Sequence, residues 1–298
     1  MKLKRSVAIN GNMLGYKMLI PSSLLILMVS IYPLLNGFYL SMTDYNLMNP
    51  GKTGFIGFEN IIKVVTADKE FYGVLGYSFI YTFFVVLLSY ITGLVIALLL
   101  NRNIKFQGLI RALILVPWVI PPVVAATNWL WVLNDQIGIV NITLRNLGLI
   151  DSPVLFLVSK NITRITVILT SVWKSFPFMV VVIIAGLKSI PKELYESAHM
   201  DGAGFFRSFR HVTLPMIKTV SLISTTLMFI WTFNNFENIY LLTMGGPSNA
   251  TYVLPILSYY TAFYRCNIGY ASAISVVILA MLLLMSVVYI RLFNKKQE

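Results

Sequence analysis

Long runs of apolar residues alternate with short polar segments along the whole chain. A helix needs about 20 residues to cross the hydrocarbon core of a bilayer, and six runs are long enough. They cover approximately Met18–Ser41, Tyr77–Leu100, Leu109–Leu133, Ile165–Leu187, Pro215–Phe236 and Ala271–Phe293. The pattern predicts an all-α membrane protein in which residues 1–298 form a single domain with six spans. Because the first run exceeds the apolar core of a signal peptide, we expect it to be an uncleaved span.

Several of these runs contain proline, which membrane helices tolerate because neighbouring groups can satisfy the freed carbonyls. The third run is unusual in holding Pro117 and the pair Pro121–Pro122 within a few residues. Proline removes a helical hydrogen bond and clashes with the preceding turn. We therefore predict a kink in the third span, where a hinge or a cavity wall could form.

The segment between the fourth and fifth spans, Ser189–Met216, is too patterned for a plain linker. Pro191 suits the first turn of a helix, and Leu194, Tyr195 and Ala198 recur on one helical face. An Asp-Gly turn follows, where glycine accepts positive φ without steric cost. We expect a second short helix, rich in Phe and Arg, to complete the segment.

The distribution of Lys and Arg predicts the orientation of the spans. With both termini in the cytoplasm, the inward-facing segments carry a large excess of basic residues, whereas basic and acidic residues balance outside. The formal net charge of +12 is therefore a topology signal and gives no reason to expect a nucleic-acid partner. The same orientation places Ser189–Met216 in the cytoplasm.

Composition narrows the class further. The chain is 57% hydrophobic and only 11% charged, whereas soluble domains carry about 25% charged residues. Its single cysteine, Cys266, allows no internal disulfide and makes a Cys-based metal site implausible.

The sequence lacks the groups that would power transport or catalysis. No Asp or Glu falls inside a predicted span, and Glu237 sits at an outer edge, whereas proton-coupled carriers need intramembrane acids. Gly51-Lys52-Thr53 imitates the end of a nucleotide-binding loop, but Asn46 occupies the position of its first glycine. We expect no enzymatic activity from this chain alone.

A motif in Ser189–Met216 is more specific. Glu196-Ser197-Ala198, Gly202 and Val212-Thr213-Leu214-Pro215 keep the spacing Glu-Ala-Ala, three residues, Gly, nine residues, Ile-x-Leu-Pro. This resembles the EAA loop of ABC importer permeases, with Ser197 and Val212 as departures. The surrounding residues resemble the carbohydrate-import, maltose-type branch, whose permeases depend on a binding protein. Other stretches resemble it as well, namely Gly57–Ile61 with Asp68 and Phe71, Thr243, Gly245–Pro247, Thr251, and Gly269–Ala271.

The resemblance implies a type I ABC importer permease with six transmembrane helices in the bacterial cytoplasmic membrane. Its partners would be a second, homologous permease subunit in a heterodimer, two ATPase subunits and an extracytoplasmic solute-binding protein. The ATPase would bind ATP and Mg²⁺, and this chain would hold no cofactor. Residues 189–216 would form a cytoplasmic coupling loop that docks on the ATPase. The implied coupling residues are Leu194, Tyr195, Glu196, Ser197, Ala198, Asp201, Gly202, Phe205 and Phe206.

Sugar sites combine aromatic rings with amide and hydroxyl groups. On that basis we hypothesise that the substrate path is lined by Asn128, Trp173, Trp231, Asn234 and Asn235. The alternative is that these Trp residues lie in interfacial belts and the Asn residues pair between helices. Lys174 is costly inside a span, and it could snorkel or meet a carboxylate or carbonyl of a partner helix.

The leading interpretation is a permease subunit of an ATP-driven importer that moves a carbohydrate, which we expect to be an oligosaccharide delivered by the binding protein. An importer of another polar solute, such as glycerol phosphate or a polyol, is the alternative. A self-contained carrier, a channel or a membrane enzyme is disfavoured by the missing intramembrane acids and catalytic groups.

Overall fold

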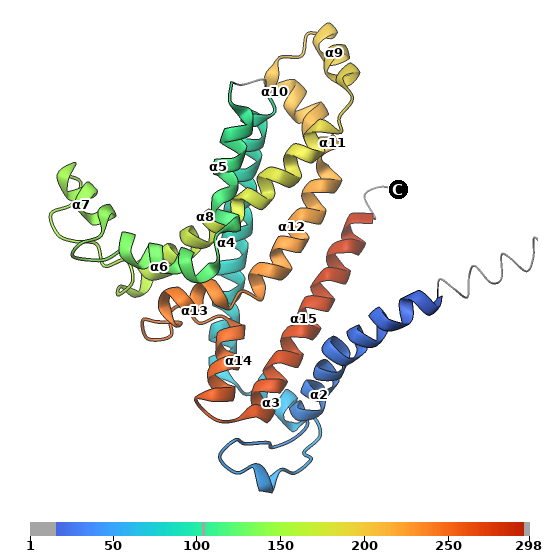
Figure 1. The fold of residues 1–298 in the computed structure, drawn as a ribbon, viewed down its shortest axis with the longest axis vertical. Helices are drawn as coiled ribbons and strands as arrows, with labels where there is room; N and C mark the ends of the chain where they lie inside the picture. The colour runs from blue at the N-terminus through green and yellow to red at the C-terminus, as the bar shows by residue number, and fades with distance from the viewer. Residues whose placement is uncertain (1–15, 103–104, 295–298) are drawn as a thin grey trace, which may run out of the picture. The chain divides into compact units, whose positions relative to one another are not determined.

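The computed structural model describes residues 16–102 and 105–294, and almost all of their regular structure is helical (Figure 1). Strand pairing within these ranges is limited to two isolated bridges, Thr43–Phe55 and Asn46–Asn267. The chain divides into two compact units, residues 1–68 with 258–281 and residues 69–257 with 282–298. The single membrane domain stays a prediction, because two compact units can belong to one domain.

The helices account for all six predicted spans. Four are long and apolar enough by themselves, namely Tyr16–Ser41, α4 (Lys69–Leu100), α8 (Lys160–Lys188) and residues Ile268–Tyr289 of α15 (Ile268–Asn294). Two helix pairs also qualify when each is counted as one bent span. They are α5 (Gln107–Val119) with α6 (Pro122–Val132), and Phe205–Met216 with α12 (Lys218–Phe233).

The first bent pair confirms the predicted kink in the third span. The axes of α5 and α6 differ by 94°, and the break lies at Ile120–Pro121. Pro121 and Pro122 have no N–H, so they cannot donate to the carbonyls four residues earlier. Ile120 takes an extended ψ of 132°, and α6 starts afresh at Pro122. Pro117 is accommodated inside α5.

The second bent pair departs from the expected fifth span, Pro215–Phe236. The helical segment turns by 63° at Ile217, and α12 ends at Phe233. A π-helical segment, η3 (Phe209–Thr213), and the short α11 (Leu214–Met216) precede the bend. Helices bend sharply at prolines and π-bulges, and both occur just before Ile217.

The larger unit is built around α4, α8 and α12. Close approach between helices depends on glycine here, since a Cβ at Gly93 of α4 would come within 2.5 Å of the Met179 Cβ of α8. Buried side chains from the three helices, together with Ile190 after α8 and Ile217 before α12, form one apolar cluster, the base cluster. Its members are Ala97, Leu100, Met179, Val180, Ile183, Ile184, Leu187, Ile190, Ile217 and Met228.

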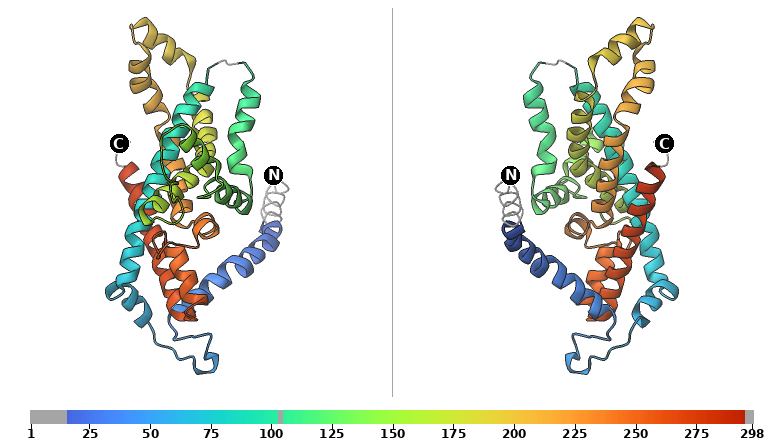
Figure 2. Two further views of the ribbon diagram at one scale, coloured as in Figure 1. Left: turned by 90° about the vertical axis from the view of Figure 1, so that its left-hand side faces the viewer. Right: turned by 90° about the vertical axis from the view of Figure 1, so that its right-hand side faces the viewer.

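Short helices stand at both ends of α12. α9 (Lys192–Met200) and α10 (Phe205–Ser208) extend beyond the ends of α4 and α8 (Figure 1 and Figure 2). α13 (Glu237–Thr243) follows the other end of α12. The remaining elements of this unit are α7 (Ile139–Asn146), the start of α14 (Leu254–Phe263) and the end of α15.

The smaller unit gathers sequence stretches that lie far apart in the chain. Its first span includes a π-helical turn, η1 (Leu27–Ile31), and ends as α2 (Tyr32–Ser41); a loop with η2 (Pro50–Lys52) leads to α3 (Glu59–Thr66). Asn60 of α3 donates to the Thr43 carbonyl at 2.8 Å, and the Tyr270 hydroxyl donates to the Asp68 carboxylate at 2.6 Å. Asn60, Asp68 and Tyr270, which belong to the stretches that resemble the permease family, therefore make contacts that hold this unit together.

Candidate functional site

The Asp-Gly turn of the loop ends α9 in a defined way. The Gly202 N–H donates to the His199 carbonyl at 3.0 Å, and the Ala203 N–H donates to the Ala198 carbonyl at 2.9 Å. These two bonds make a Schellman cap, in which the residue after the helix adopts positive φ. Gly202 has a φ of +76°. The turn predicted from the sequence is confirmed, and it directs the chain from α9 into α10.

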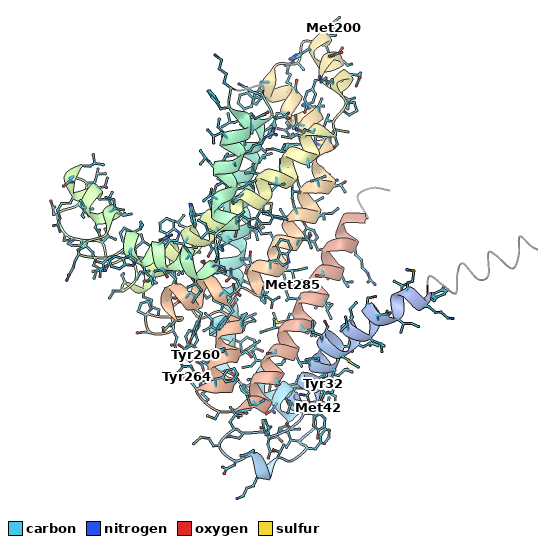
Figure 3. The ribbon with its side chains drawn as sticks, in the orientation of Figure 1. Tyr32, Met42, Met200, Tyr260, Tyr264 and Met285 are labelled. Carbon is cyan, nitrogen blue, oxygen red and sulfur yellow. The ribbon has the colours of Figure 1, made fainter. Side chains whose placement is uncertain are left out.

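The tip of the loop exposes apolar side chains. Leu194 is 41% exposed, Phe205 57%, Phe206 82% and Met200 89%. Figure 3 shows Met200 at the outer end of this part of the molecule. Clustered exposed apolar side chains mark interaction sites. Met200 was not singled out from the sequence, although its place at the end of α9, beside the Asp-Gly turn, was visible.

Most of the polar and small members of the predicted coupling set are also exposed. Glu196, Ser197, Asp201 and Gly202 are exposed, and Ala198 is half-buried. A Cβ added to Gly202 would meet no atom of this chain within 4 Å. The loop thus offers a carboxylate and small side chains beside the apolar tip, an arrangement that suits a protein partner.

Tyr195 is the exception among the predicted coupling residues. It is half-buried and packs against the base cluster. Its hydroxyl shares a hydrogen bond of 3.0 Å with the Thr213 hydroxyl, which is buried at the end of η3. Tyr195 therefore joins the loop to the body of its own chain.

A cavity of about 480 Å³ lies in the larger unit beside the break between α5 and α6. The side chains around it come from α5, α6, α8, α12 and α13, and from the segment 234–236 between α12 and α13. They are Trp118, Pro122, Lys174, Ser175, Phe178, Met228, Trp231, Thr232, Asn234, Asn235, Phe236, Glu237 and Asn238.

Three of the five hypothesised path residues line this cavity: Trp231, Asn234 and Asn235. The other two do not. The Trp173 ring packs edge-to-face against Trp129 with centroids 5.4 Å apart, which ties α8 to α6. Asn128 is exposed on α6, away from the cavity lining.

Aromatic contacts hold the cavity wall together. The Phe178 ring of α8 lies 5.9 Å from Trp118 of α5 and 5.1 Å from Trp231 of α12, between centroids. Sequence reasoning missed Trp118 and Phe178, although their positions beside prolines in the third and fourth spans were a usable signal. Apolar rings with a few amides and charges are typical of small-molecule sites.

Lys174 has a partner within its own chain. Its Nζ donates to the Ile120 carbonyl at 2.8 Å, at the break between α5 and α6. A cation is favourable there because helix carbonyls at a C-terminus carry partial negative charge. The carbonyl partner that was one of the open possibilities is therefore confirmed, but it belongs to this chain. Lys174 and Glu237 are the charged residues among those lining the cavity.

Buried hydrogen bonds fix the far side of the cavity. The Asn238 amide donates to the Ser171 hydroxyl at 2.7 Å, and the Tyr81 hydroxyl donates to the same oxygen at 2.9 Å. The Asn235 side chain accepts from the Asn238 N–H at 3.2 Å. The first two bonds connect α4, α8 and α13, and the third is a local bond from Asn235 to the first turn of α13.

Among residues 16–102 and 105–294, no three His, Cys, Asp or Glu side chains are grouped as metal ligands. That the chain itself holds no cofactor stays a prediction.

Sequence comparisons find one family over most of the chain. The model of the family described as "Binding-protein-dependent transport system inner membrane component" matches residues 89–296. The trehalose/maltose transport system permease protein MalF of Thermococcus litoralis is 34% identical over 96% of this chain and 95% of its own length. The trehalose transport system permease protein SugA of Mycobacterium tuberculosis is 33% identical, with 94% and 89% covered. The sulfoquinovosyl glycerol transport system permease protein SmoG of Agrobacterium fabrum is 30% identical, with 98% and 94% covered.

Solved structures share the fold. A chain of a bacterial alginate ABC transporter, crystallised in complex with an alginate pentasaccharide-bound periplasmic protein, superposes with a TM-score of 0.82. It is 22% identical, and the alignment covers 95% of this chain and 94% of that chain. A chain of a bacterial ABC transporter involved in the import of alginate gives a TM-score of 0.77, again at 22% identity, covering 97% and 99%. This likeness confirms the predicted fold class.

Proposed function

Because the chain belongs to the family of inner membrane components of binding-protein-dependent transport systems, we propose that it forms half of the translocation path of an ATP-driven carbohydrate importer. The chain is a multi-pass permease of the cytoplasmic membrane rather than an enzyme, as the family and its relatives show. It works with a solute-binding protein, as the family description states. The family predicted from the EAA-like loop is thereby confirmed.

The cavity supports a carbohydrate as the solute. Trp231 and Phe178 present aromatic faces, and Asn234 and Asn235 present amides that can bond sugar hydroxyls. Several relatives carry sugar names, including trehalose and maltose. The runner-up is another polar solute, such as glycerol phosphate or a polyol. An anionic solute fits this half of the path less well, because the Lys174 cation shares the cavity with the Glu237 carboxylate.

The exposed loop tip supports an ATPase as the partner of residues 189–216. In this proposal Glu196 pairs with a basic residue of the ATPase, while Ser197, Ala198 and Gly202 allow close approach. Leu194, Phe205 and Phe206 supply apolar contact, consistent with their exposure. ATP and Mg²⁺ would be bound by the two ATPase subunits.

A second, homologous permease subunit would complete the path. Exposed apolar helix faces are consistent with lipid and a second subunit as neighbours. The cytoplasmic placement of both termini follows from the distribution of basic residues. Some of those residues, Lys2, Lys4, Arg5, Lys295 and Lys296, lie outside the described part of the chain.

The test is reconstitution of the complete transporter in liposomes with its binding protein. We expect ATP-dependent uptake of a neutral oligosaccharide, and no uptake when either the ATPase or the binding protein is omitted. Alanine at Asn234 should reduce uptake without loss of assembly, because Asn234 lines the cavity and is exposed in this chain. Uptake driven by an ion gradient without ATP would overturn the proposal, and selective uptake of glycerol phosphate would replace the solute.

A further inference from the structure

We propose that the hydrogen bond between Tyr195 and Thr213 is a strut that transmits movement of the coupling loop to α12. The inference rests on the proposed function, because it takes the loop to be the place where the ATPase acts. It assigns Tyr195 a positioning role inside the permease, in contrast to the outward role expected from the sequence. Tyr195 would govern how efficiently ATP hydrolysis is converted into solute movement.

The strut joins the first helix of the coupling loop, α9, to the end of η3. Tyr195 lies in α9, and Thr213 ends η3 after the chain has passed through the Asp-Gly turn and α10. The two hydroxyls are 3.0 Å apart, and Thr213 is only 4% exposed. Breaking the bond is costly on the Thr213 side, because a buried hydroxyl that loses its partner is left unsatisfied. The bond therefore holds α9 against the segment that leads into the fifth span.

The ring of Tyr195 gives the strut a second point of support. It packs against the base cluster, to which α4, α8 and α12 all contribute. Val212 and Leu214, on either side of Thr213, pack against the same cluster. Both ends of the strut are thus seated on one close-packed surface, and interiors of this density transmit displacement rather than absorb it.

The position of Thr213 determines where the movement goes. Four residues later the chain bends by 63° at Ile217, which is 1% exposed and belongs to the base cluster. α12 then runs to Phe233 and carries Trp231 into the cavity lining. With the strut in place, α9 and residues 205–216 move together and act on α12 at the bend. Without it, α9 can pivot at the Gly202 turn, and the movement is lost in the loop.

The structure offers a matched control for removing one tyrosine hydroxyl. Tyr90 of α4 donates to the Ser221 hydroxyl of α12 at 3.0 Å, and Tyr90 also packs against the base cluster. This bond has the same chemistry and length as the strut but does not bridge the loop. Tyr90→Phe therefore measures how coupling changes when a hydroxyl at the base cluster is lost. Tyr195→Phe measures the same change together with the effect of losing the strut.

The experiment uses the complete transporter in liposomes and compares Tyr195→Phe, Thr213→Val, the double variant, Thr213→Ser and Tyr90→Phe. Co-purification of the ATPase measures docking, and the number of ATP molecules hydrolysed per solute transported measures coupling. We expect Tyr195→Phe and Thr213→Val each to raise that number several-fold while docking is retained. The double variant should be no worse than either single variant, because all three remove the same bond. Thr213→Ser and Tyr90→Phe should resemble the unmodified transporter.

Three results would overturn the strut: equal coupling in Tyr195→Phe and Tyr90→Phe, additive effects of the two single variants, or loss of ATPase docking in Tyr195→Phe. The third counts against it because the strut acts after docking. Failure of the proposed function looks different, since the unmodified chain would then fail to co-purify with an ATPase or would transport solute without ATP.

Discussion

Replacing Lys174 with methionine tests how the bend in the third span is held. The substitution removes the ammonium and retains an unbranched apolar side chain, so packing along α8 changes little. What is lost is the 2.8 Å bond from Nζ to the Ile120 carbonyl. That carbonyl lies where two consecutive prolines already deprive the helix of N–H donors. We expect the bend to become less well defined and the cavity beside it to open or collapse.

The magnitude follows from the type of bond and its exposure. Hydrogen bonds that involve a charged group contribute about 1.5–3 kcal/mol net. Lys174 is half-buried, so solvent screening places this bond near the lower end, at about 1.5 kcal/mol. Since about 1.4 kcal/mol is a tenfold change in an equilibrium, the population of conformers with an altered bend should rise about tenfold.

Spin labels on the two arms of the bend provide the assay. Leu113 of α5 and Trp131 of α6 are both exposed, at 62% and 64%, and Cys266 would first be replaced by serine. In the assembled transporter we expect one main distance between the labels, a broader distribution in Lys174→Met, and recovery in Lys174→Arg, which keeps a charged donor. Solute uptake should fall with the broadening. If the distance distribution in Lys174→Met matches that of the unmodified chain, the bond from Lys174 to the Ile120 carbonyl does not hold the bend.

Three further predictions concern packing, docking and the cavity. Gly202→Asp should abolish ATPase co-purification, whereas Gly202→Ala should weaken it less. Asp tolerates the positive φ at this position better than Ala, and no atom of this chain would clash with its side chain. A larger effect of Asp would therefore come from its bulk and charge at the interface with the ATPase. A larger loss of co-purification in Gly202→Ala than in Gly202→Asp would indicate that backbone strain, and not the interface, causes the effect. Gly93→Ala should destabilise the detergent-solubilised protein by about 1–3 kcal/mol through overpacking against α8. Gly73→Ala, in the same helix with nothing within 4 Å, should leave thermal unfolding unchanged or improve it, and equal melting of the two would contradict the close approach. Trp231→Ala should reduce uptake at constant assembly, whereas Ile223→Ala, on the same helix outside the cavity lining, should not; equal uptake by both would remove Trp231 from the path.

Features set by local backbone chemistry could be predicted from the sequence. The Asp-Gly pair predicted the turn after α9, and the φ of +76° at Gly202 with its capping bonds confirms it. The double proline predicted a kink, and the break falls at Ile120–Pro121. The length of apolar runs predicted the spans. In each case one or two residues restrict the backbone whatever surrounds them.

Features set by contacts between helices were harder to predict. The run Pro215–Phe236 is long and largely apolar, so hydropathy gives no sign of the bend at the buried Ile217. Every residue has a backbone carbonyl, so nothing marks that of Ile120 as the partner of Lys174. Polarity within a span also cannot distinguish a cavity-lining Trp231 from a Trp173 that packs between helices.

α8 and α12 each contribute to the cavity and to the base cluster. α8 places Lys174 at the cavity and Leu187 in the base cluster, and α12 runs from the bend at Ile217 toward the cavity. With 16 residues, α12 is about 24 Å long, so its two ends are separated by most of the apolar thickness of a bilayer. Near the base cluster the two helices are in close contact, because a Cβ at Gly186 would lie 3.3 Å from the Val220 side chain. Sliding of one helix past the other is therefore opposed at that end. A push from the coupling loop should instead tilt α12 about this contact, and a tilt about one end produces its largest displacement at the other end, beside the cavity.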